Sequence, residues 1–117
     1  MVCHLTDAFH CATGDKTAVE ASNFMQRTLI KWIALRVPIP WPQGVPTRPE
    51  FDQFIDGNPP TDFELDRAKL ICVIARFTDK PRDFEFHPHP IFRHLSEADW
   101  MRWGWLHCDH HLRQFGV

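Results

Sequence analysis

The residues most suited to binding a ligand or to catalysis are three histidines near the end of the chain, in the stretch LHCDHHLRQFGV at 106–117. On an α-helix, a rotation of about 100° per residue places His107 and His111 on one face, with His110 at its border. The same face carries two tryptophans, a glycine and a glutamine: Trp100, Trp103, Gly104 and Gln114. The opposite side is charged and is predicted to face solvent, which turns the histidine face inward.

Two imidazoles one turn apart on an inward face must find hydrogen-bond partners or share a ligand that uses both ring nitrogens. The i, i+4 spacing lets both rings converge on one divalent ion at about 2.0–2.1 Å, as in the HExxH motif of zinc peptidases. No glutamate follows His107, so the peptidase mechanism is not supported. The alternative is a pair of exposed polar residues with no ligand. The tryptophan-rich face favours the metal site.

A metal site needs a third ligand, and the chain offers six candidates: His4, His10, His87, His89, His94 and Cys108. His4 is the best of them because it lies beside an apolar stripe that would turn it between helices. Its alternative interpretation is a histidine near a frayed terminus. The two histidines of HPHP at 87–90 are more typical of a turn or a pocket rim.

Four stretches with helical periodicity must position these residues. The first runs from Met1 to about Thr13 and stops at Gly14. The second runs from about Thr17 to Arg36. It must end before VPIPWPQGVPTRP at 37–49, because the five prolines there forbid a continuous helix.

The third helix begins after Asp62, a candidate N-cap, and runs to about Asp79. The fourth opens with Ser96 as N-cap and is predicted to run to the end of the chain. Together they predict an all-α fold, a four-helix bundle with a long Pro-rich connection between helices 2 and 3. At 117 residues, the whole chain, 1–117, is predicted to be a single domain.

Composition excludes several classes of partner. Lys and Arg total 13 against 15 acidic residues, so the chain lacks the basic footprint of a nucleic-acid-binding protein. The longest apolar run, LIKWIAL at 29–35, is too short to span a bilayer. The start, MVCHLTDAFH, lacks the features of a secretory signal, which predicts a cytoplasmic protein. The four cysteines form no CxxC pair and are expected to be reduced, small buried residues.

Three segments, VCHLTDAF, HPHPIFRHLSEADWMRW and HCDHHLRQF, together resemble the DinB-like (DNA-damage-inducible) family of metal-binding four-helix bundles, in particular a subgroup of uncharacterised bacterial proteins. The most specific element is the pair His107 and His111 followed by Arg113 and Gln114. The resemblance implies an ion held by His4, His107 and His111, with zinc or nickel as the usual metal. The family name records regulation and implies no contact with DNA.

Three protein ligands with an open position are typical of a catalytic site, where a bound water or thiol loses its proton more readily. Some DinB-like relatives are thiol-dependent S-transferases. The resemblance therefore implies a metal-dependent thiol transferase, or a hydrolase, that acts on a small-molecule substrate with a low-molecular-weight thiol. The alternatives are a metal that only staples the helices and a small-molecule binding module without turnover.

Two further residues carry predictions. Asp7, one turn after His4, is a candidate catalytic base or a partner of a metal ligand, and equally a candidate surface acid. Trp41, in the Pro-rich segment, could belong to a homodimer contact or to the lid of a pocket.

Overall fold

The computed structural model describes residues 1–117 and is all-helical. It has no β-strand, and its one extended pairing is an isolated antiparallel bridge between His89 and Arg93. Its elements are α1 (Val2–Thr13), the π-helical turn η1 (Gln26–Ile30), α2 (Lys31–Arg36), the 3-10 turn η2 (Pro49–Phe51), α3 (Phe63–Thr78) and α4 (Glu97–Gln114). The predicted all-α class is confirmed. None of the helices combines the length and the hydrophobicity that a membrane span requires.

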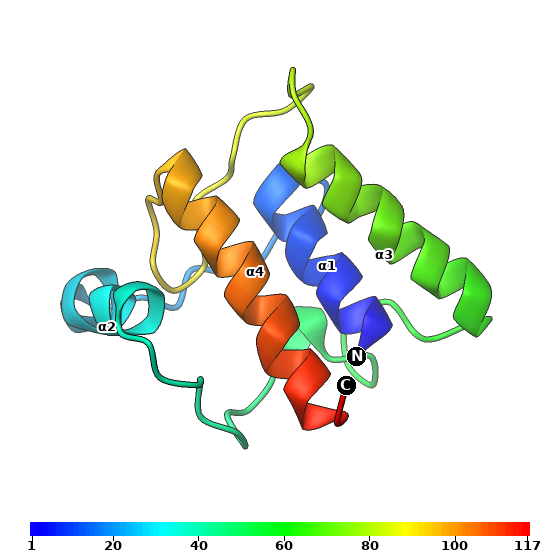
Figure 1. Ribbon diagram of the computed structural model, residues 1–117, viewed down its shortest axis with the longest axis horizontal. Helices are drawn as coiled ribbons and strands as arrows, with labels where there is room; N and C mark the ends of the chain where they lie inside the picture. Colours follow the sequence, from blue (N-terminus) through cyan, green and yellow to red (C-terminus); the bar gives the residue numbers. More distant parts are fainter. The chain divides into compact units, whose positions relative to one another are not determined.

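The chain divides into two compact units, of which the first contains residues 1–18 and 46–87. In this unit α1 and α3 lie side by side (Figure 1). Phe9 of α1 and Phe77 of α3 meet edge to face, with ring centroids 4.9 Å apart. Both rings are almost completely buried. Burial of each contributes on the order of 2 kcal/mol, so this contact is central to the core of the first unit.

The end of α1 is set by the glycine that follows it. The helix ends at Thr13, as predicted, because Gly14 follows with a φ of 87°, a conformation that residues with a Cβ rarely adopt. A Cβ at this position would also collide with the ring of His87. Glycine is therefore required both by the turn and by the close packing of the imidazole.

The start of α3 is fixed by two carboxylates. Asp62 accepts a hydrogen bond from the backbone N–H of Leu65 at 3.1 Å, which confirms the predicted N-cap. Asp66, buried in the first turn, accepts from the backbone N–H of Thr61 at 2.7 Å and from its hydroxyl at 2.8 Å. These bonds tie the chain before the helix to the helix itself. α3 ends at Thr78, within one residue of the predicted end.

The second unit contains residues 19–45 and 88–117. The predicted start of its first helix, near Thr17, is wrong, because residues 17–23 are not helical and the helix begins at Phe24. The reason is a reciprocal cap. The side chain of Asn23 accepts from the backbone N–H of Gln26, and the Gln26 side chain accepts from the backbone N–H of Asn23, both at 2.9 Å. This pair is the Asn and Gln version of a capping box.

α4 opens at the predicted N-cap, since Ser96 accepts a hydrogen bond from the backbone N–H of Asp99. Trp100 and Trp103 are buried, as expected for core residues, and pack edge to face at 5.2 Å. The prediction that this helix runs to the end of the chain is wrong by three residues. Gly116 has a φ of 74°, and the backbone N–H of Val117 bonds to the carbonyl of Leu112, which closes the helix in a Schellman motif.

Candidate metal centre

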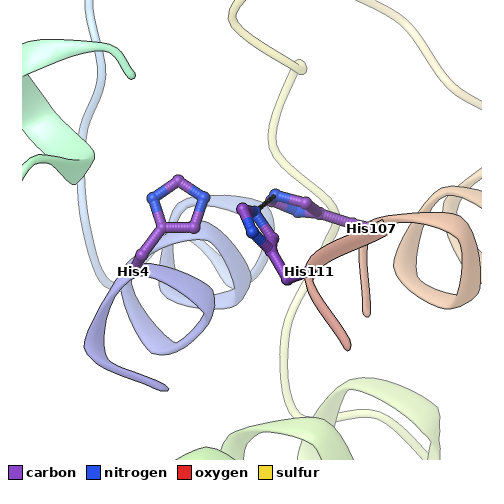
Figure 2. A group of neighbouring side chains, drawn as sticks. All are labelled: His4, His107 and His111. Atoms are coloured by element: carbon purple, nitrogen blue, oxygen red, sulfur yellow. Dashed lines mark hydrogen bonds between the residues drawn. The ribbon is translucent and has the colours of Figure 1, made fainter. Parts of the chain in front are cut away.

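The centre of the candidate site is the pair His107 and His111 on α4. Both side chains are half-buried, and their Nε2 atoms lie 3.2 Å apart. Figure 2 shows the two rings meeting through these nitrogens, with the dashed line marking the contact. The i, i+4 spacing thus brings both imidazoles to one point, as the helical geometry predicted.

The separation of the two Nε2 atoms suits a shared ion. Two nitrogens that each lie about 2.0–2.1 Å from one tetrahedral ion are about 3.3 Å apart. An N–H···N hydrogen bond between the rings has a similar length, in which case one ring must carry its proton on Nε2. Both arrangements require an Nε2 lone pair on at least one of the two rings.

Gln114 holds the other side of the His111 ring. The Nδ1 atom of His111 lies 2.8 Å from Oε1 of Gln114, and an amide oxygen can only accept, so Nδ1 carries the proton. The amide nitrogen of Gln114 lies 3.1 Å from Nε2 of His110, to which it can donate. His111 consequently presents the lone pair of Nε2 toward His107, as a metal ligand must.

The pair is walled by aromatic side chains of the second unit. The Trp103 ring lies 4.9 Å from the His107 ring, and Trp41 lies 6.0 Å from both His107 and His110. Trp41 is held in place because its indole N–H donates to the carbonyl of Ala34 at 2.9 Å. These rings lie against one side of the histidine pair.

His4, the predicted third ligand, lies on α1 in the first unit. Its Nδ1 atom lies 3.1 Å from the carbonyl oxygen of Phe51, the last residue of η2. A carbonyl accepts only, so Nδ1 is the protonated nitrogen, and Nε2 keeps its lone pair. A histidine ligand commonly donates its other N–H to a backbone carbonyl in this way.

The three histidines predicted from the sequence, His4, His107 and His111, form a group that could hold a metal ion (Figure 2). The other predicted candidates do not belong to it. They are His10, His87, His89, His94 and Cys108. Burial also raises the pKa of the Cys108 thiol, which disfavours the thiolate that metal binding requires.

The two histidines of HPHP support local turns, one of the two roles that the sequence predicted for them. Nδ1 of His89 accepts hydrogen bonds from the backbone N–H groups of Ile91 and Phe92, both at 3.1 Å, and its ring stacks on Phe92 at 4.6 Å. The ring of His87 packs over Gly14, where a Cβ would not fit. Both imidazoles therefore serve local structure.

Asp7 lies on α1, fully buried, so the alternative of a surface acid is wrong. Its carboxylate accepts from the backbone N–H of Asn58 at 2.8 Å and from the Asn58 side-chain amide, and it lies 3.3 Å from the ammonium of Lys16. These contacts fasten the loop after η2 to α1. The catalytic role of Asp7 stays a prediction.

Some contacts around the histidines had no sequence signal. The Phe51 carbonyl is a backbone group that any residue at that position could supply, so no residue type indicates it. The position of Trp41 beside His107 depends on how the Pro-rich segment folds back. The hydrogen bond from His111 to Gln114, in contrast, follows from their i, i+3 spacing on one helix face.

Comparison with known proteins places the chain in a family without describing its activity. The searches of curated proteins and of solved structures each found no match. One family model, described as a protein of unknown function (DUF1569), matches residues 10–116. The match includes His107 and His111, and His4 lies outside it. Because the model covers most of the sequence, the chain belongs to the DUF1569 family of proteins of unknown function.

Proposed function

We propose that the protein binds one divalent metal ion through Nε2 of His4, His107 and His111. The observation that carries this proposal is that the His4 and His111 rings are both protonated on Nδ1. The Phe51 carbonyl accepts a hydrogen bond from Nδ1–H of His4, and the Gln114 amide oxygen accepts one from Nδ1–H of His111. The Nε2 atom of each ring therefore carries a lone pair. Three neutral imidazoles with an open coordination position suit zinc or nickel.

The proposal extends to the fold. The likeness of three segments to the DinB-like family, together with the four α-helices, supports a four-helix bundle in which the first and last helices supply the ligands. The DUF1569 match neither requires nor opposes this relationship.

For activity, we propose a metal-dependent thiol transferase. The metal, when bound, supplies a positive charge that favours deprotonation of a thiol or water. The chain itself would hold the ligands through Phe51 and Gln114 and exclude water through Trp41 and Trp103. Support for the thiol comes from the DinB-like resemblance.

The second candidate is a metal that serves stability alone. An ion that binds only the folded chain stabilises it by mass action, and no turnover is needed to explain the ligands. The two candidates differ in one measurable property. A catalytic site exchanges an outer ligand, whereas a purely structural ion is closed to added thiols.

The first experiment is metal analysis of the untagged full-length protein, with single variants His4→Ala, His107→Ala and His111→Ala. The control is His94→Ala, which removes an exposed histidine outside the site. We expect near-stoichiometric zinc or nickel in the wild type and in the control, and loss of metal in the three site variants. Circular dichroism spectra would show that each variant keeps its helices.

Three results would contradict the proposal in different ways. Wild-type protein that takes up no zinc or nickel on titration has no metal site. If His4→Ala keeps its metal while His107→Ala and His111→Ala lose theirs, the site is formed by the α4 pair and His4 is not a ligand. Equal metal loss in His94→Ala would mean that the metal was adventitious.

The thiol transferase is tested separately, by following the reaction of a low-molecular-weight thiol such as cysteamine with chlorodinitrobenzene. In this reaction a carbon–sulfur bond replaces a carbon–chlorine bond, chloride leaves and the thiol proton passes to solvent. We expect a rate that needs metal and falls in His107→Ala. A metal-loaded protein whose rate equals that of buffer would support the structural ion instead.

A further inference from the structure

A cavity of about 330 Å³ lies entirely within the second unit, between α4 and the Pro-rich segment 37–43. Its volume is at the small end of the range of ligand pockets in proteins. The α4 side of the cavity is the charged face, which the sequence predicted to be open to solvent. The Pro-rich segment folds over part of that face and turns it into one wall of a pocket.

The opposite wall, formed by the Pro-rich segment, is restrained by its prolines and by a hydrogen bond. Pro38 and Pro40 fix the backbone of the segment, and the indole N–H of Trp41 is tethered to the carbonyl of Ala34. A wall that is already in place costs little conformational entropy when a ligand enters. The restrained segment therefore favours ligand binding in this cavity.

Both walls also carry apolar side chains that are partly exposed to solvent. Ile39 from the segment and Trp105 from α4 line the cavity, and they are 56% and 62% exposed. A ligand with an aromatic or aliphatic body would cover both, at a gain of about 25 cal/mol per Å² of apolar surface removed from water. Trp41 adds a further aromatic surface.

The polar groups at the cavity favour a negative charge. Arg102 and Arg113 line it with one carboxylate, Asp109. Arg113 donates to Asp109 through Nε at 2.7 Å, and Arg102 donates to the Leu35 carbonyl, also through Nε. The terminal Nη groups of both guanidiniums make no hydrogen bond to the protein, so they can bind an anion. The local charge is positive in a chain whose formal net charge is -2.

We infer that this cavity binds a small organic carboxylate with an apolar body. Its carboxylate meets the Nη groups of Arg113, and its body lies against Ile39 and Trp41 and toward Trp105. Guanidinium and carboxylate form strong charge-assisted hydrogen bonds, and the restrained apolar wall selects the rest of the molecule. The cavity reaches His110, whose ring lies beside Trp41 and is linked to His111 through Gln114. Binding here does not require the proposed metal.

The test uses phenylacetate as probe, with phenylacetamide as its neutral analogue and acetate as its analogue without an apolar body. Binding is measured by calorimetry on the full-length protein, both as purified and after chelation of metal. We expect phenylacetate to bind with a dissociation constant on the order of 1 mM or tighter, and both analogues to bind at least about tenfold more weakly. Chelation should leave this order unchanged.

Arg113→Gln tests the guanidinium directly, and we expect it to weaken phenylacetate binding about tenfold while phenylacetamide binding changes little. The matched control is Arg67→Gln, which removes an exposed arginine from an i, i+3 ion pair on α3. Trp105→Ala tests the apolar wall and should weaken both probes.

Several results would overturn the inference. They are the absence of saturable binding, equal affinity for phenylacetate and phenylacetamide, and equal weakening in Arg67→Gln. Loss of phenylacetate binding in His107→Ala or after chelation would mean that the carboxylate binds the metal instead. Retained binding in a protein that proves free of metal would support the cavity while the metal proposal fails.

Discussion

Oε1 of Gln114 accepts the Nδ1 proton of His111, one turn away on the same helix, and the amide nitrogen of Gln114 faces His110. One side chain therefore sets the tautomer of a proposed metal ligand. Partners of this kind hold a ligand ring in position, and their loss typically weakens metal affinity about 10–100-fold.

We predict that Gln114→Leu lowers zinc affinity within that range, because Nδ1 of His111 loses its acceptor and the ring its orientation. Gln114→Glu should keep the affinity, since a carboxylate accepts the same proton. The measurement is competition with a chromophoric chelator, and Leu112→Ala, an exposed neighbour, is the control. Unchanged affinity in Gln114→Leu would mean that the glutamine only fills the end of the helix.

Asp66 predicts how the stability of the protein depends on pH. Hydrogen bonds from the backbone and then from the hydroxyl of Thr61 lower the pKa of Asp66 from 3.8 to about 2. Because the folded-state pKa is lower, the carboxylate stabilises the fold fully above pH 4 and loses this contribution as the pH falls toward 2. Thermal unfolding between pH 6 and pH 2 should show a steeper loss in the wild type than in Asp66→Asn. Parallel curves for the two proteins would disprove this role.

Asp7 predicts a large loss of stability on truncation. In Asp7→Ala, the Asn58 amide groups and the Lys16 ammonium would lose their buried acceptor, at a cost of about 2–3 kcal/mol. Urea unfolding followed by tryptophan fluorescence would measure it. Asp56→Ala, which removes an exposed carboxylate from the same loop, should change the unfolding free energy by less than about 0.5 kcal/mol. In the thiol transferase assay, Asp7→Asn keeps the shape of the side chain and removes its basicity, so a role as a base predicts a lower rate at an unfolding free energy higher than that of Asp7→Ala.

The cysteines predict a defined order of alkylation. All four are free thiols, but the expectation that all are buried is wrong, because Cys72 is exposed and Cys108 is only half-buried. Burial raises the pKa of Cys3, Cys11 and Cys108, and Asp66 adds to the effect at Cys3. Since the thiolate is the reactive form, iodoacetamide at pH 8 should modify Cys72 first. Peptide mass spectrometry after short exposure would check this, and earlier modification of Cys3 or Cys11 would contradict the burial described here.

The sequence determined the features that depend on neighbours along the chain. The ends of α1 and α3, the cap of α4 and the convergence of His107 with His111 follow from residue types at fixed spacing on a helix. The capping pair Asn23 and Gln26 is local too, but the apolar periodicity that predicted a helix from Thr17 does not contain it.

Tertiary structure alone decided the contacts that join distant segments. The Phe51 carbonyl meets His4 across 47 positions of sequence, and Asn58 reaches Asp7 across 51. Trp41 meets His107 only because the Pro-rich segment folds back along α4. No local periodicity encodes such contacts, because they depend on loop paths and on backbone groups that every residue carries. The sequence could therefore name the histidines, while the fold supplied the atoms that orient them.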